Sequence, residues 1–145
     1  MQEQMVLPAR EGPLRYTGEV RQGDVISLRD FLASRTGEIT RRHDAGADEY
    51  RVAQAVGVTA EVNAALLLEA LSVRDDLLRR DEESSRRLLE TCVRQITVHW
   101  AVLVALAERW TDTVGYDAGR WRLPRYGTPE QEGVMAWLGF PWSPR

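Results

Sequence analysis

The sequence has no lysine, a single cysteine and only two histidines among its 145 residues. All nineteen basic residues are therefore arginine, a bias that fits a GC-rich coding sequence better than a binding role. With Cys92 alone, the chain can form neither an intramolecular disulfide nor a thiolate metal cluster. We expect Cys92 to be a small buried hydrophobic residue on a helix.

Long uncharged apolar runs and a signal-peptide pattern are also missing, so a cytoplasmic location is expected, or a virion location if a phage encodes the chain. The net charge of −3 provides no basic field that would attract nucleic acid or an anionic membrane. A chain of 145 residues with 43% hydrophobic residues is typical of one globular domain.

Apolar residues recur at alternating spacings of four and three along the stretch from Asp81 to Trp110. They are Leu89, Val93, Ile96, Trp100, Leu103, Ala107 and Trp110. This spacing makes one continuous apolar stripe on a helix. Because an isolated helix gains little stability from propensity alone, other helices must cover the stripe. The sequence therefore predicts an all-α, single-domain bundle of four to five helices around a long central helix.

Residues 1–24 contain too many glycines and prolines for a helix and are expected to form an extended arm, with a short strand at Leu14–Arg21. Both a docked arm and a partner-binding arm are consistent with its apolar residues. The helical domain is expected over residues 25–145. Its first helix should begin at Ser27, which forms a capping box with Asp30.

Gly57 is expected to end a short helix over Ala47–Val56, and Thr59 to cap a longer helix over about Ala60–Arg80. The segment Val52–Leu66 accordingly resembles a helix-turn-helix. However, the opening of its second helix offers no arginine or glutamine to reach base edges. A simple helix–glycine–helix corner is the preferred interpretation, and a DNA-binding regulator is an alternative.

The remaining connections are expected where breakers or charges gather. A break or kink is expected at Ala45-Gly46, and an irregular segment over 111–126. In the charged run 79–87 either a tight turn lies or one helix continues through it, and the turn is the preferred interpretation. A last helix should begin after Thr128, where a proline and a capping glutamine follow, and should end at Gly139.

Arg94 and His99 match the Arg-x4-6-His motif of the HEPN ribonucleases, which are small all-helical domains. That resemblance implies that Arg94 stabilises phosphate charge and that His99 acts in acid–base chemistry. With nineteen arginines in the chain, roughly half of such sequences would match by chance. A half-buried His99 bonded to a neighbouring carbonyl is the preferred interpretation, and the ribonuclease is an alternative.

Aromatic residues gather near the C-terminus, between Trp110 and Trp142. Because aromatic anchors dominate interface energies, an exposed subset would bind a protein partner. The residues predicted to do so are Tyr16, Trp121, Phe140 and Trp142. The opposing interpretation is that Trp121, with Trp110 and Trp137, closes the core.

The C-terminal part resembles an uncharacterised family of short helical proteins from GC-rich bacteria and their phages. The resemblance covers about 40 residues. Its matching positions are Arg94, Ile96, His99, Asp112, Tyr116, Trp121 and Arg122. The family has no established activity, so the resemblance implies a source and a helical fold but no chemistry.

The sequence contains no nucleophile paired with a base, no phosphate-binding glycine loop and no metal-ligand spacing. We therefore predict no catalytic residues, no cofactor and no metal. The leading hypothesis is a non-enzymatic interaction protein or structural component, with a phage-related role, that binds a protein partner or itself. Nucleic acid and membrane are not expected partners.

Overall fold

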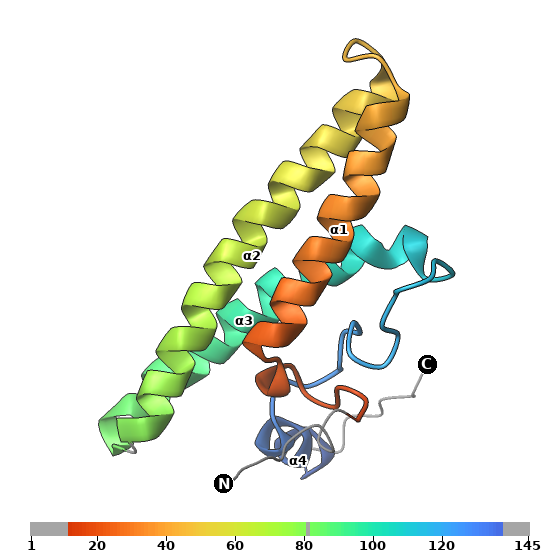
Figure 1. Cartoon of the computed structure of the whole chain (residues 1–145). Coiled ribbons are helices and arrows are strands. Elements are labelled where there is room, and N and C mark those ends of the chain that lie inside the picture. Colours follow the sequence, from red (N-terminus) through yellow and green to blue (C-terminus); the bar gives the residue numbers. More distant parts are fainter. Residues whose placement is uncertain (1–11, 81, 138–145) are drawn as a thin grey trace, which may run out of the picture.

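The computed structural model describes residues 12–80 and 82–137, which form helices and connecting segments without a β-strand (Figure 1). The α-helices are α1 (Gln22–Arg42), α2 (Asp48–Arg80), α3 (Arg86–Ala107) and α4 (Pro129–Trp137). The single-turn 3-10 helices are η3 (Thr17–Glu19), η4 (Glu83–Ser85) and η5 (Glu108–Trp110). The predicted all-α class is confirmed. The strand expected at Leu14–Arg21 is wrong, because η3 lies there.

Helices α1 and α2 lie side by side as a long antiparallel hairpin (Figure 1). They are joined at residues 43–47, which confirms the break predicted at Ala45-Gly46. With 33 residues, α2 is about 50 Å long. A side chain at Gly57 would place its Cβ 3.3 Å from the hydroxyl oxygen of Thr36 on α1. Gly57 therefore allows the two helices to approach closely.

The helix end predicted at Gly57 is wrong, since α2 is one continuous helix from Asp48 to Arg80. Thr59 does not cap a new helix, because its hydroxyl donates to the carbonyl oxygen of Ala55 at 2.8 Å, within the same helix. The segment Val52–Leu66 therefore lacks the turn that a helix-turn-helix motif requires.

Helix α3 crosses the α1–α2 hairpin behind its lower half in Figure 1 and contacts α2 extensively. Its predicted apolar stripe is confirmed: Ile96, Trp100 and Leu103 are 0% exposed. Cys92 is buried beside this stripe, as expected. The tight turn predicted between the helices is also confirmed, since α3 begins at Arg86 after η4. However, the longest helix is α2, which packs against both α1 and α3.

The start predicted for the first helix at Ser27 is wrong, because α1 begins at Gln22. The side chain of Asp24 accepts a hydrogen bond of 2.9 Å from the backbone N–H of Arg21 at the helix start. The Ser27 hydroxyl instead donates to the carbonyl oxygen of Asp24 inside the helix. The carboxylate of Asp24 therefore takes the capping role that the sequence assigned to Ser27 and Asp30.

The described part of the arm is docked rather than free. Leu14, Thr17 and Val20 are at most 1% exposed. The hydroxyl oxygens of Thr17 and Thr97 lie 2.8 Å apart, which ties the arm to α3. The described part of the arm therefore packs on the core and covers it.

The C-terminal segment packs against the arm. The backbone N–H of Gly18 donates to the carbonyl oxygen of Gly127 at 2.7 Å. Thr128 caps α4 as predicted, because its hydroxyl oxygen accepts from the backbone N–H of Gln131 at 3.1 Å. The end predicted at Gly139 lies outside the described residues.

Candidate protein-binding surface

Two hydrogen bonds fix how α2 and α3 lie against each other. Nδ1 of His99 lies 2.9 Å from the amide oxygen of Asn63, and the thiol of Cys92 donates to the carbonyl oxygen of Ala70 at 2.9 Å. Both bonds join α2 to α3. The earlier residue of α2 pairs with the later residue of α3, and the later residue of α2 with the earlier one of α3. The two helices are therefore antiparallel neighbours with a defined register.

The bond to Asn63 also indicates the tautomer of His99. The amide nitrogen of Asn63 donates to the carbonyl oxygen of Thr59 at 2.9 Å, which orients its amide oxygen towards His99. Because an amide oxygen only accepts, Nδ1 of neutral His99 carries the proton. The expected half-buried histidine bonded to a carbonyl is thus confirmed, with the carbonyl supplied by a side chain.

Arg94 and His99 do not converge on one site. Five residues apart on a helix, they are separated by about 140° around the axis. Arg94 is exposed, whereas His99 is half-buried at the α2–α3 boundary. Acid–base chemistry on a phosphodiester needs both groups near the same reacting atoms. Within one chain, Arg94 and His99 therefore do not lie near the same reacting atoms.

A groove runs along the exposed side of the α2–α3 pair. We call it the α2–α3 groove, and its volume is about 390 Å³. Its apolar walls are Leu66, Ala70, Val73 and Leu77 from α2, and Leu88 and Cys92 from α3. Leu66, Val73 and Leu88 are 45%, 47% and 61% exposed. Three large aliphatic side chains in one groove form a clustered apolar surface, and such surfaces mark binding sites more often than scattered residues do.

The apolar surface of α2 continues beyond the groove. By length and composition, α2 and the segment Glu83–Trp110 could each cross a membrane, a property that core helices of soluble proteins share. In the most apolar window of α2, however, only 28% of the residues are buried. Much of the apolar surface of α2 is therefore left uncovered by the described part of the chain.

The aromatic residues predicted to bind a partner fall into three situations. Trp121 is 4% exposed, and its ring centroid lies 5.0 Å from that of Phe31 and 5.3 Å from that of Tyr116. Trp121 is therefore a core residue that pins the irregular segment, as the opposing interpretation held. Phe140 and Trp142 lie outside the described residues.

Tyr16 is half-buried on the arm, and its hydroxyl donates to the carboxylate of Glu132 at 3.1 Å. This hydrogen bond is the main cause that raises the pKa of Tyr16 above its ordinary value of 10.0. Tyr16 thus links the arm to α4, and its contacts are intramolecular in this structure.

A second hollow, of about 380 Å³, lies beside Arg120 and the arm. Arg120 is 7% exposed, and its guanidinium forms an ion pair of 2.7 Å with Asp24. The same guanidinium donates to the carbonyl oxygens of Gly12 and Glu19. The hydrogen bond to Asp24 is the main cause that raises the pKa of Arg120. Arg15, which also lines the hollow, pairs with Glu19 at 3.2 Å, so the chain itself provides partners for both of these cations.

Among residues 12–80 and 82–137, no three His, Cys, Asp or Glu side chains gather in a way that could hold a metal ion. Within the described residues the α2–α3 groove is the candidate site, and the fold is an all-α protein whose α2–α3 pair the rest of the described chain leaves partly uncovered.

Known protein families, characterised proteins and solved structures give no match to this chain. The resemblance to the phage-associated family therefore remains a hypothesis.

Sequence reasoning missed the groove, although its signal was present. The apolar set of Ala60–Arg80 is too broad for one stripe, and it predicts a helix covered on more than one side. In the structure α1 and α3 cover α2 on two sides. The stripe of Val62, Leu66 and Val73 on α2 remains exposed.

Proposed function

We propose that this protein is a non-enzymatic interaction component that binds another protein chain through the α2–α3 groove. The observation that carries the proposal is the exposure of Leu66, Val73 and Leu88 in one groove between α2 and α3. Helix-in-groove recognition uses such apolar channels on helical scaffolds. A structural role in a phage particle belongs to the same proposal and rests on the family resemblance.

A protein fits this surface better than a membrane does. Helices that lie on membranes are rich in arginine or lysine on their polar face. Between Val52 and Val73, α2 has only Glu61 and Glu69 as charged residues. An acidic helix face is repelled by anionic lipid headgroups and by phosphates. The groove as a whole has charges of both signs on its edges, Glu69 on α2 and Arg94 on α3, and a protein surface can complement both.

Site-specific photocrosslinking in living cells tests the proposal. A benzoylphenylalanine residue would replace Val73, which is 47% exposed in the groove. The matched control replaces Val52, which lies on the same helix outside the groove and is 57% exposed. We expect discrete covalent adducts from position 73 and few from position 52.

Two results would count against the proposal. The first is the lack of any protein adduct from position 73 in cells that contain the natural partners. The second is equal crosslinking from positions 73 and 52, because it would show no preference for the groove. Co-sedimentation with anionic lipid vesicles, abolished by Val73→Glu, would assign the surface to membranes instead.

A further inference from the structure

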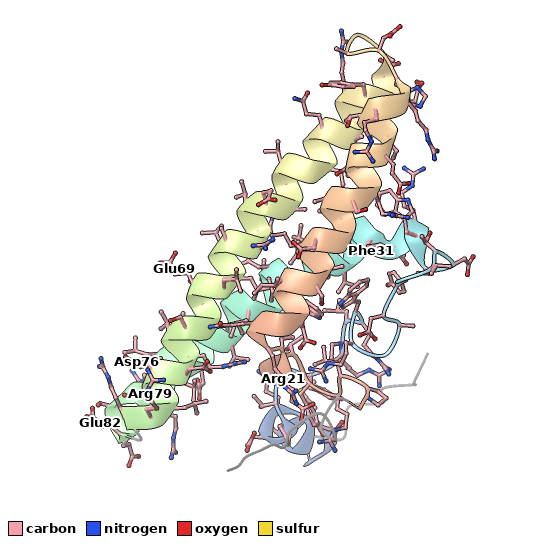
Figure 2. The ribbon with its side chains drawn as sticks, in the orientation of Figure 1. Arg21, Phe31, Glu69, Asp76, Arg79 and Glu82 are labelled. Carbon is pink, nitrogen blue, oxygen red and sulfur yellow. The ribbon has the colours of Figure 1, made fainter. Side chains whose placement is uncertain are left out.

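The α2–α3 pair has one covered side and one open side. Helix α1 packs on the first side, and no residue of α1 lines the α2–α3 groove. Figure 2 shows Glu69 projecting from the side of α2 that faces away from α1. An antiparallel helix pair with an open apolar groove is half of a four-helix bundle. A second helix pair would complete it.

Charges of opposite sign lie along the two outer edges of this open side. On α2, Glu69 and Asp76 are seven residues apart, and on α3 so are Arg87 and Arg94. A spacing of seven places each pair on one edge of its helix. Because Asp76 pairs with Arg79 and Arg80 of its own helix, at 3.2 and 2.9 Å, Glu69 and Arg94 carry the opposite charges of the two edges.

The register of the helices sets these charges at matching levels. The bonds from Asn63 to His99 and from Ala70 to Cys92 place Glu69 level with Val93, one residue from Arg94. By the same register Asp76 lies one residue from the level of Arg87. Within the described residues no ion pair joins Glu69 to Arg94, and both side chains are exposed.

We infer that the occupant of the α2–α3 groove is the same groove of a second copy, related by a two-fold axis parallel to the helices. Such an axis places α2 of one copy against α3 of the other, antiparallel and at the same level. The apolar residues Leu66, Val73 and Leu88 then form the centre of a four-helix bundle.

The two-fold axis also brings the edges together. Glu69 of each copy meets Arg94 of the other, so the contact occurs twice in one dimer. A two-fold axis perpendicular to the helices would instead place α2 against α2 and acidic residues against acidic residues. Charge complementarity selects the first arrangement.

This inference rests on the proposed function and is tested by sedimentation equilibrium of the full chain over a wide concentration range. The wild type is expected to have twice the 16.5 kDa mass of one chain. Glu69→Arg and Arg94→Glu should each weaken the dimer about tenfold, since each reverses two symmetric contacts. The double variant Glu69→Arg with Arg94→Glu should restore the dimer, because the charges are exchanged and not lost.

Val73→Glu should give a folded monomer, and Val52→Glu, outside the groove, should remain a dimer. Circular dichroism confirms that each variant is folded. A wild-type monomer at every concentration overturns the inference, and so does a dimer that Val73→Glu leaves intact. If the double variant does not form the dimer again, the two-fold arrangement is overturned.

The crosslinking experiment separates this inference from the proposed function. Adducts from position 73 with other proteins, and none with a second copy, would leave the proposed function standing and remove the dimer. The lack of any adduct would remove both. Adducts at twice the chain mass, lost with Arg94→Glu and recovered in the charge exchange, would support both.

Discussion

Arg120 joins the irregular segment after α3 to the arm and the start of α1, which lie 96 to 108 positions earlier in the sequence. Its guanidinium donates to both carboxylate oxygens of Asp24, at 3.0 and 2.7 Å, and its side chain is only 9% exposed. It also donates to the carbonyl oxygens of Gly12 and Glu19 on the arm. No local pattern reveals such a residue, since Asp24 is 96 positions away.

Removing this guanidinium should destabilise the protein strongly. In Arg120→Met the carboxylate of Asp24, 12% exposed, loses its ion pair and keeps only its hydrogen bond from the backbone N–H of Arg21. We expect the free energy of unfolding to fall by about 3–5 kcal/mol. The control is Arg79→Met, whose ion pair with Asp76 is exposed and should contribute at most about 1 kcal/mol. Urea unfolding of both variants measures the difference, and equal losses would contradict the prediction.

Cys92 should be unreactive while the protein is folded. It is 4% exposed, and burial raises the pKa of its thiol above the ordinary value of 9.0. Labelling by a water-soluble disulfide reagent at pH 8 should therefore proceed at the rate of local opening. Labelling at the rate of a free thiol would contradict the buried position.

The same pKa shift predicts a decline of stability in alkali. Above the unfolded-state pKa the unfolded chain loses its thiol proton, whereas folded Cys92 still holds it. The folded state then binds more protons, so the free energy of unfolding falls as the pH rises above about 9. Urea unfolding at pH 8 and pH 10 should show a smaller decline in Cys92→Ala. The raised pKa of Tyr116 acts in the same direction and remains in both proteins.

At the scale of single helices, α2 shows why a glycine is ambiguous in a sequence. Gly57 follows an apolar stretch and precedes Thr59, which is the pattern of a helix end. In the structure Gly57 provides room for Thr36 of α1. Both roles require a residue without a side chain, and only the neighbouring helix decides between them.

Two proline substitutions in α2 distinguish a helix end at Gly57 from a continuous helix that passes through it. Val58→Pro places the ring inside a continuous helix and should lower the free energy of unfolding by about 3 kcal/mol. Asp48→Pro is the matched control, because proline is tolerated at the first position of a helix. A tolerated proline at position 58 would indicate a turn there and restore the helix-turn-helix interpretation.

The stripe of α3 could be predicted because its information is local: every third or fourth residue is apolar, whatever covers it. The α2–α3 groove could not be predicted in the same way. Leu66 and Val73 look like core residues in the sequence, and only the packing of α1 and α3 leaves them exposed. A second apolar stripe on a helix indicates that another surface must bury it. The sequence does not indicate whether that surface belongs to the same chain or to another one.

At the scale of the whole molecule, the arm connects all the helices. Arg74 of α2 donates to the carbonyl oxygens of Gly18 and Val20, at 2.9 and 2.8 Å. Thr17 bonds Thr97 of α3 and Gly18 bonds Gly127 before α4. The core thus depends on a segment that contributes only one short 3-10 helix.

This dependence predicts that a small change in the arm affects the entire fold. A side chain at Gly18 would place its Cβ 2.7 Å from the carbonyl oxygen of Gly127, a contact that only a backbone shift can relieve. Gly18→Ala should therefore separate the two segments and weaken the bonds to Arg74 and Thr97. We expect a loss of about 2 kcal/mol, in the range of disruptive buried substitutions.

The control is Gly133→Ala, since nothing lies within 4 Å of a Cβ at this exposed position of α4. It should leave stability unchanged or raise it by up to about 1 kcal/mol, because alanine favours helix more than glycine does. Thermal unfolding is followed by far-ultraviolet circular dichroism and by tryptophan fluorescence. If the arm connects the molecule into one cooperative unit, both signals of Gly18→Ala move together to lower temperature. A fluorescence change that precedes the loss of helix would mean that the arm and the helices unfold independently.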